Sequence, residues 1–211
     1  MTRHILLLCL LGNPFELNLG GHQRTVLEII EHFKDMPRLE ITVITTTKSS
    51  LKQLTPNHLY SNIVLYEISI KKEWFENQDL LYDNRNFLYE TVKKIYENIK
   101  HPITLVHSTY WISGLLASQL CTEYHLTQIH SVISTSCERK RNGFSPVSSH
   151  QYESEQFFLP KVDCIISITE SEYELLIEKY HLEPHKIIVV GRTVSDCFLR
   201  LAHLPSGNLE Q

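Results

Sequence analysis

Two adjacent glycines stand where the first expected helix of the chain begins. Gly20 and Gly21 follow the apolar run HILLLCLLG and precede TVLEIIEHF, whose apolar residues recur at helical spacing. Glycine lets a backbone approach a ligand closely, and the amides at a helix N-terminus attract anions. A phosphate or a polar sugar ring would suit such a loop. A turn that needs positive φ explains the pair equally well, so the glycines alone leave both interpretations open.

The segment LVHSTYWISG, residues 105–114, puts aromatic and polar side chains after another expected strand. We expect it to expose His107, Tyr110 and Trp111 at one edge of the sheet. Aromatic rings pack against the C–H faces of sugars, so this segment suits sugar recognition. The alternative is that Trp111 simply anchors its helix in the core.

A third segment, HSVISTSCERKRNG, carries a short cationic cluster after a strand. Arginine binds phosphate through its planar fork, and lysine binds it as a point charge. Arg139, Lys140 and Arg141 are therefore candidate phosphate ligands. The competing interpretation is a solvated basic loop, which is the commoner role of an isolated cationic triplet. Because the cluster follows the carboxyl end of a strand, phosphate binding and a solvated loop are equally good interpretations.

The elements that must position these residues alternate between strands and helices. Strand-like runs occupy residues 5–11, 39–46, 62–70, 103–108, 127–134, 163–169 and 186–190. Helical patterns separate most of them, Thr169 and Glu172 form a capping box, and residues 135–147 read as an irregular basic loop. The alternation predicts an α/β fold, a single doubly wound Rossmann-like domain with a mostly parallel sheet. Ligands of such sheets bind beyond the carboxyl ends of the strands, where all three segments lie.

Composition and charge narrow the class of protein. The 211 residues have a net charge of -4, which gives no reason to expect nucleic acid or an anionic membrane as a partner. Five scattered cysteines without a CxxC pair indicate reduced thiols and a cytoplasmic location, and Cys9 and Cys164, inside apolar runs, are expected to be buried. The N-terminal apolar run is too short to span a bilayer and lacks a signal-peptide cleavage site. The sequence contains no HExxH, DxD or Cys/His spacing that would predict a metal site. It also contains no GxGxxG motif and no P-loop that would predict a site for a dinucleotide or a nucleoside triphosphate.

Together these segments resemble a known family. GGHQRTVLEIIEHF looks like the Gly-Gly loop and first helix of the retaining glycosyltransferases of family 4, which have the GT-B fold. VHSTYWISGLLA is similar to the family's His-Ser-His-Tyr-Trp-Leu-Ser-Gly segment, and HSVISTSCERKRNG to its His-Thr-x-His-x-Leu-Gly-x-x-Lys-Arg loop. Residues 153–198 resemble the stretch that ends the family's N-terminal domain, where a Glu-rich helix precedes a strand. The likeness runs from about residue 5 to residue 198.

The resemblance implies roles for particular residues. The glycine loop would lie at the cleft between two domains, near the donor phosphate and the acceptor, and the segments around Trp111 and after Ser134 would face the acceptor. Lys140 or a neighbour would contact a charged group of the acceptor. The implied substrate-binding residues are Gly20, Gly21, His22, Thr109, Tyr110, Trp111, Ser134, Arg139 and Lys140.

Two departures from the family pattern weaken the expectation of catalysis. The family usually has histidines where this chain has Thr109 and Ile133, and isoleucine can neither hydrogen-bond a sugar hydroxyl nor relay a proton. His107 and His130 remain, but they match histidines that more often support the strand ends. No catalytic residue is therefore assigned.

The resemblance also implies a second domain that binds most of the nucleotide-sugar. Residues 1–198 would be the acceptor-side half of a GT-B enzyme, and residues 199–211 a tail or the start of the interdomain linker. The expected substrates are a UDP- or GDP-sugar and an unknown acceptor, with no tightly bound cofactor and with a donor domain or glycosyltransferase subunit as a further partner. The 211 residues alone are expected to be inactive, and the alternative is a non-catalytic pseudo-glycosyltransferase that binds or stabilises a true enzyme.

Overall fold

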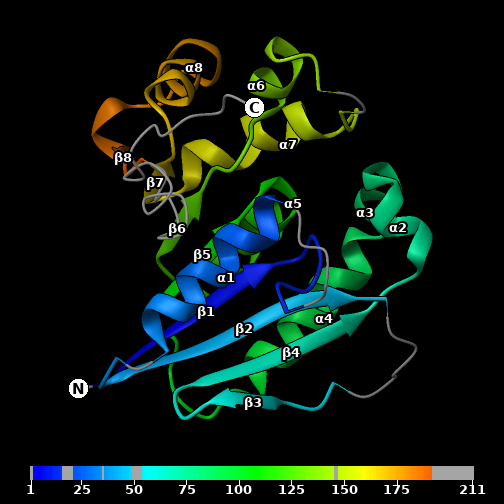
Figure 1. The fold of residues 1–211 in the computed structure, drawn as a ribbon, viewed down its shortest axis with the longest axis vertical. Helices are drawn as coiled ribbons and strands as arrows, with labels where there is room; N and C mark the ends of the chain where they lie inside the picture. The colour runs from blue at the N-terminus through cyan, green and yellow to red at the C-terminus, as the bar shows by residue number, and fades with distance from the viewer. Residues whose placement is uncertain (1, 16–20, 35, 49–53, 145–146, 192–211) are drawn as a thin grey trace, which may run out of the picture.

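A computed structural model describes residues 2–15, 21–34, 36–48, 54–144 and 147–191, and they form one α/β domain around an eight-stranded sheet (Figure 1). The order of strands across the sheet is β3-β4-β2-β1-β5-β6-β7-β8. Only the edge strand β3 is antiparallel. The strands are β1 (Arg3–Cys9), β2 (Leu39–Thr47), β3 (Asn57–Tyr60), β4 (Ile63–Ser69), β5 (Leu105–Thr109), β6 (Gln128–Ser131), β7 (Cys164–Ser167) and β8 (Ile187–Val189).

The strand order reverses between β1 and β5, because β2 and β4 follow β1 on one side and the later strands follow β5 on the other. Helices cover both faces in Figure 1. They are α1 (Gly21–Phe33), α2 (Lys72–Glu76), α3 (Gln78–Asp83), α4 (Arg85–Glu97), α5 (Trp111–Tyr124), α6 (Ser136–Arg141), α7 (Gln151–Phe158) and α8 (Glu170–Tyr180), with short 3-10 turns at Leu159–Lys161 and Pro184–Lys186. The predicted doubly wound, mostly parallel sheet is confirmed.

Alternate residues of the central strands point to opposite faces of the sheet and pack into two separate hydrophobic cores. On one face Leu7 and Cys9 of β1 pack with Val26 and Ile30 of α1. On the other face Leu6 and Leu8 join a larger cluster with α4, α5, α7 and α8. Burial between helices on both faces explains why Ile5 to Cys9 of β1 form a continuous apolar run in the sequence.

The structure corrects three expectations about the elements. Strand β3 was not predicted, and the expected strand at residues 127–134 ends at Ser131. The expected loop contains helix α6, because the Thr135 side chain accepts a hydrogen bond from the backbone N–H of Glu138 and caps the helix. The predicted cap at Thr169 is confirmed, since its side chain accepts from the N–H of Glu172.

The two cysteines expected in the core have different environments. Cys9 is fully buried, and burial raises the pKa of its thiol to about 12. Cys164 on β7 is partly exposed, so the prediction that it is buried is wrong. The reason is that no described helix lies over its side of β7.

Within the described ranges no helix combines the length and apolar character that crossing a membrane requires. The predicted tail at residues 199–211 lies outside the described residues.

Candidate functional site

The polar residues singled out in the sequence lie at the carboxyl edge of the sheet, around the point where the strand order reverses. Helix α1 begins beyond β1, α5 beyond β5 and α6 beyond β6, so three helix N-termini meet there. Crevices of this kind are the usual ligand sites of open parallel sheets.

Gly21 is the first residue of α1 and is exposed. A Cβ atom added at this residue would meet no heavy atom within 4 Å. The backbone at the start of the helix is therefore sterically open to close approach by another molecule. Gly20 lies outside the described residues.

His22 follows in the first turn of α1 and is only 9% exposed. Its Nε2 lies 3.0 Å from Oγ1 of Thr109 at the end of β5, and its ring lies 5.6 Å from the ring of Tyr110, centroid to centroid. The Thr109 hydroxyl donates to the backbone carbonyl of Leu8 at 3.4 Å. This arrangement makes His22 Nε2–H the donor to Thr109 and leaves a lone pair on Nδ1.

The Nδ1 atom of His22 is buried and has no hydrogen-bond partner among the described residues. Burial lowers the pKa of His22 to about 4, so the ring is neutral at neutral pH. An unpartnered buried acceptor beside an open helix N-terminus can receive a hydroxyl or another donor from a ligand.

Tyr110 and Trp111 are 4% and 2% exposed, so the prediction that they are exposed is wrong. The indole Nε1–H donates to the side-chain oxygen of Gln78 at 3.1 Å, and the Tyr110 hydroxyl donates to the same atom at 3.3 Å. Gln78 begins helix α3, and the ring of Tyr82 on that helix lies 6.0 Å from the indole, centroid to centroid. Helix α3 therefore covers both aromatic residues, and Trp111 anchors α5 in the core.

Tyr110 has a φ of 67°, in the region that residues with a Cβ atom rarely adopt. This conformation joins the end of β5 to the start of α5. Strained backbone of this kind often accompanies functional sites and costs roughly 1–3 kcal/mol.

His107 and His130 tie β5 to β6 from the two faces of the sheet. Nε2 of His107 lies 2.8 Å from Oγ of Ser131, and Nδ1 of His130 lies 2.9 Å from Oγ of Ser108. Burial lowers the pKa of His107 to about 4 and that of His130 to about 3. Both histidines have the contacts of residues that support the strand ends.

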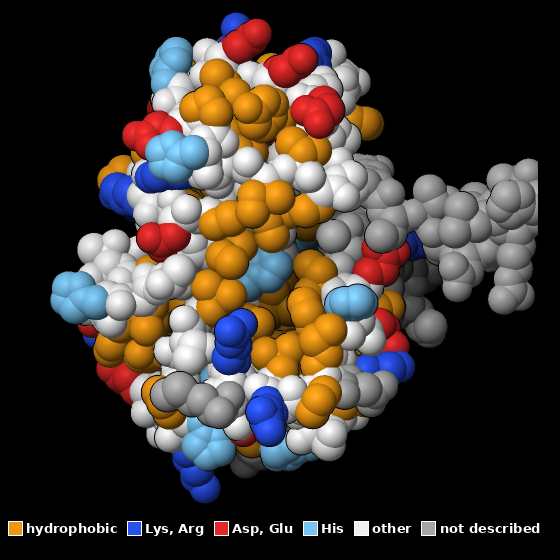
Figure 2. Space-filling view, turned by 90° about the vertical axis from the view of Figure 1, so that its left-hand side faces the viewer, with side chains coloured by type: hydrophobic (Ala, Val, Ile, Leu, Met, Phe, Trp, Pro, Cys, Tyr) orange, Lys and Arg blue, Asp and Glu red, His pale blue; other side chains and the backbone are white. Residues whose placement is uncertain are grey.

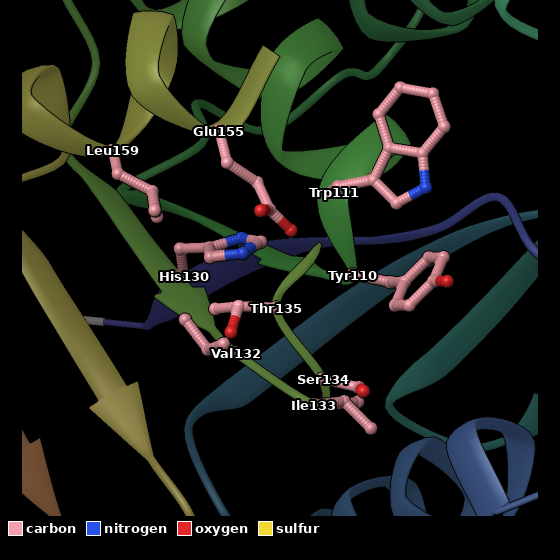
Figure 3. A pocket seen from close by; sticks show the side chains of 9 residues that line it. All are labelled: Tyr110, Trp111, His130, Val132, Ile133, Ser134, Thr135, Glu155 and Leu159. Carbon is pink, nitrogen blue, oxygen red and sulfur yellow. The ribbon is translucent and has the colours of Figure 1, made fainter. Parts of the chain in front are cut away.

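A small pocket of about 10 Å³ opens beyond the end of β6 (Figure 3). That volume is at the lower limit for one water molecule and cannot hold a sugar. The residues that line the pocket are Tyr110, Trp111, His130, Val132, Ile133, Ser134, Thr135, Glu155 and Leu159. Of the predicted binding residues, Tyr110, Trp111 and Ser134 meet here, and Ile133 lines the position where the family usually has a histidine.

Glu155 was not among the residues predicted from the sequence, and it points from α7 toward His130 and Thr135 in Figure 3. Its two carboxylate oxygens lie 3.2 and 3.0 Å from the backbone N of Ser136, and they also accept from Gln151 and Tyr180. Burial raises the pKa of this carboxyl to about 7. In the structure Gln151, Ser154, Glu155 and Phe158 of α7 are all buried, which places Glu155 on the face of the helix that packs against the domain.

A second buried carboxylate holds the same turn. Oε1 of Glu172 accepts the backbone N–H of Thr135 at 3.3 Å, and burial raises the pKa of Glu172 to about 8. Glu172 therefore holds the backbone of Thr135 and Glu155 holds that of Ser136, so the cations of α6 project from a turn that buried side chains hold in place.

The three cations of α6 differ in direction. Arg139 is partly buried, and its charge partly opposes the rise that burial causes in the pKa values of Tyr110 and Glu155, so its guanidinium is close enough to act on both groups. Lys140 is exposed, and its Nζ lies 5.7 Å from the ring centroid of Tyr152. Arg141 donates to the Ser171 hydroxyl on α8. Only Arg139 shares the surroundings of Tyr110.

Among the described residues there is no group of three His, Cys, Asp or Glu side chains that could hold a metal ion.

The order and direction of the strands define the chain as a single Rossmann-like α/β domain. The family model for Glycosyltransferase Family 4 matches residues 19–196. The chain therefore belongs to glycosyltransferase family 4.

Solved structures agree on the fold. Sucrose-phosphate synthase from Thermosynechococcus elongatus has a TM-score of 0.69 and 17% identity over 96% of this chain and 53% of its own. UGT89C1 of Arabidopsis thaliana, complexed with UDP-L-rhamnose, has a TM-score of 0.61 and 10% identity over 93% of this chain and 51% of its own. This chain thus spans about half the length of these proteins. No protein of curated function matches it.

Proposed function

We propose that the chain is the acceptor-side domain of a retaining glycosyltransferase, which transfers a sugar from a nucleotide-sugar to an acceptor. The observation that carries the proposal is the juxtaposition at the β1–β5 reversal. There an open backbone at Gly21 lies next to the buried, unpartnered Nδ1 of His22 and the hydroxyl of Thr109. A helix N-terminus with free backbone approach suits phosphate, and a neutral imidazole acceptor suits a sugar hydroxyl.

The proposed donor is a UDP- or GDP-sugar. UGT89C1, whose structure resembles this chain over about half of its length, has been solved with UDP-L-rhamnose. The start of α1 would meet the donor phosphates. Most donor contacts would come from a second Rossmann-like domain, because charge on the departing nucleotide must be stabilised by groups fixed in advance around it.

The proposed acceptor carries an anionic group. The charge of Arg139 acts on Tyr110 and Glu155, and the buried side chains of Glu155 and Glu172 hold the preceding turn in place. A guanidinium on a rigid turn can bind phosphate or carboxylate through two parallel hydrogen bonds. Arg139, more than Lys140, is therefore the residue that we expect to select an anionic acceptor.

An NMR titration of the full chain tests these assignments. Glucose 6-phosphate serves as the anionic sugar probe, glucose as its neutral counterpart, and UDP-glucose and GDP-glucose as donor probes. We expect the sugar phosphate to shift the amide signals of Gly21, His22 and Ser134 more than glucose does. The nucleotide-sugars should bind weakly, because most of their contacts would be made by the second domain.

Two variants sharpen the test. Arg139→Gln should weaken binding of the sugar phosphate by about tenfold, since a hydrogen bond to a charged group contributes about 1.5–3 kcal/mol. Lys140→Gln is the matched control and should bind as the wild type does. Equal losses in the two variants, or no shift at Ser134 beside α6, would contradict the proposed acceptor site.

A non-catalytic role is the second candidate, and one observation favours it. The pocket beyond β6 is too small for a sugar, and Ile133 lines it in place of a histidine. The chain would then bind or stabilise a complete glycosyltransferase. Isolating the chain from its source cell with its bound proteins distinguishes the two: a full-length GT-B partner whose activity does not depend on Arg139 supports this role. Transfer that is lost in Arg139→Gln supports the acceptor-side role.

A further inference from the structure

Helix α3 places one polar atom against two consecutive residues at the start of α5. Oε1 of Gln78 accepts from the Tyr110 hydroxyl at 3.3 Å and from the Trp111 indole N–H at 3.1 Å. An amide oxygen has two lone pairs, so these two hydrogen bonds use both of them. In Figure 3 the hydroxyl of Tyr110 and the indole nitrogen of Trp111 point to the same side, away from Glu155.

These two aromatic side chains are held inside the domain and not at its surface. Hydrophobic side chains that do reach the surface line a hollow in Figure 2. Tyr110 and Trp111, by contrast, are only 4% and 2% exposed, and Gln78 is partly buried. A buried hydroxyl and a buried indole N–H need an acceptor inside the protein, because an unpaired buried donor is costly. The amide of Gln78 therefore restricts where both rings can lie.

The backbone of Tyr110 needs such a restraint, because its φ of 67° lies in a region that residues with a Cβ atom rarely adopt. Conformations of this kind persist only where the surrounding structure fixes them. The Tyr110 carbonyl accepts from the backbone N–H of Gly114, and its own N–H donates to the carbonyl of Ser131. Any residue could make these two backbone hydrogen bonds. The hydrogen bond to Gln78 comes from the side chain, so it fixes the direction of the ring.

The ring of Tyr110 contacts the histidine of the candidate site. Its centroid lies 5.6 Å from that of the His22 ring, and the two planes are inclined by 50°. Thr109, the residue before Tyr110, has its Oγ1 atom 3.0 Å from Nε2 of His22. Two consecutive residues therefore hold the imidazole, one through a hydroxyl and one through a ring. A chain of direct contacts runs from Gln78 through Tyr110 to His22.

Helix α3 is itself fixed to the rest of the domain. It has six residues and is too short to be stable on its own. The carboxylate of Asp79 accepts a hydrogen bond from the hydroxyl of Ser148. The ring of Tyr82 stacks on the ring of His150, with the centroids 4.1 Å apart. The helix that carries Gln78 is therefore anchored to the segment that precedes α7.

We propose that Gln78 is a positioning residue of the candidate site, which acts by holding the Tyr110 ring against His22. Nδ1 of His22, which has no hydrogen-bond partner among the described residues, then keeps the orientation in which it can accept from a ligand hydroxyl. The identity of that ligand rests on the proposed function, whereas the positioning of the rings does not. A purely structural role of Gln78 would affect stability but neither the contact between the rings nor the affinity for a ligand.

The positioning can be tested without a ligand. In NMR spectra of the full chain, we expect a nuclear Overhauser effect between the rings of Tyr110 and His22. Gln78→Met removes the acceptor at a similar side-chain length, so it should weaken this effect and shift the ring signals of His22. Gln78→Glu keeps the acceptor oxygens and should preserve both signals. Asp83→Asn changes an exposed residue of the same helix, and this matched control should alter neither signal.

The consequence for binding can be measured with glucose 6-phosphate. Gln78→Met should weaken its binding by about two- to tenfold, the range expected for the loss of one hydrogen bond, and Gln78→Glu should restore it. Tyr110→Phe removes one hydroxyl and leaves the hydrogen bond between Trp111 and Gln78. It should weaken binding as much as Gln78→Met does, and the double variant should lose no more, because both changes remove the same interaction. Circular dichroism checks the fold, and Tyr110→Phe decides the question if Gln78→Met does not fold.

The proposal fails if the contact between the rings is unchanged in Gln78→Met and in Tyr110→Phe. Equal losses in Gln78→Met and Gln78→Glu would show that the shape of the side chain matters and not its oxygen. Additive losses in the double variant would show that Gln78 and Tyr110 act independently. If the wild type binds no glucose 6-phosphate while Gln78→Met still separates the rings, the proposed ligand is wrong and the positioning role is supported.

Discussion

His22, in the first turn of α1, lies with its Nε2 atom 3.0 Å from the hydroxyl oxygen of Thr109, which is 87 residues later in the chain. This hydrogen bond joins the start of one helix to the end of β5 across the point where the strand order reverses. It also leaves Nδ1 as the ring nitrogen of His22 that has no hydrogen-bond partner among the described residues.

Replacing Thr109 by valine should destabilise the domain by about 1–3 kcal/mol, because the substitution removes the hydroxyl and leaves a buried ring nitrogen unpaired. Thr109→Ser is the control, since it keeps the hydroxyl and loses one methyl group. Urea denaturation measures both. A serine variant that is as unstable as the valine variant would show that packing, not the hydrogen bond, accounts for the loss.

The buried His22 predicts a loss of stability in acid. Its pKa is about 4 in the folded chain and 6.5 in the unfolded chain, so only the unfolded chain takes up the proton between these values. The free energy of unfolding should therefore fall as the pH drops from 6.5 to 4, by up to about 3 kcal/mol from this residue. Denaturation of wild type and His22→Gln over this range measures the contribution, and parallel curves would contradict it.

The buried carboxyl of Glu155 should make the free energy of unfolding depend on pH in the opposite direction. Its pKa is about 7 in the folded chain and 4.5 in the unfolded chain, so the folded chain keeps a proton that the unfolded chain has lost. The free energy of unfolding should fall as the pH rises from 4.5 to 7, by up to about 3 kcal/mol relative to Glu155→Gln. If wild type gains stability over the glutamine variant as the pH rises, the carboxyl is instead ionised in the fold.

Replacing Gly114 by alanine should disturb the packing between α5 and α7. A Cβ atom at this residue would lie 2.5 Å from Cζ of Phe158 and 2.7 Å from Cε1 of His130. Gly114→Ala should therefore destabilise the domain by about 1–3 kcal/mol through overpacking, although alanine favours helix. Gly21→Ala is the matched control, because its Cβ meets nothing, and it should leave stability unchanged or slightly higher. A neutral Gly114→Ala would mean that α5 and α7 can separate without cost.

The sequence predicted the sheet better than it predicted the site. Strands that lie between two cores carry apolar residues at nearly every position. A short apolar run in the sequence is therefore enough to recognise them. The burial of Trp111 could not be predicted in this way, because it depends on Gln78 and Tyr82 more than 25 residues earlier. Glu155 was missed because its partners, Ser136 and Tyr180, come from separate helices.

Helix α6 is a different case, because a local pattern was present. Thr135 and Glu138 have the spacing of a helix cap, but the following cations suggested a solvated loop. At β7 the apolar run around Cys164 led to the prediction that this cysteine is buried, whereas it is partly exposed. The sequence of a strand does not reveal whether a helix elsewhere in the chain covers it.

The two histidine–serine bonds between β5 and β6 lie on opposite faces of the sheet. A shift of either strand by one residue would move both histidines away from their serine partners. Both hydrogen bonds therefore stabilise the same register between β5 and β6. The turns after Thr109 and Ser131 consequently begin at strand ends whose positions do not depend on the sequences of the turns. Those turns can be rebuilt to recognise a different ligand while the strands beneath them keep their alignment.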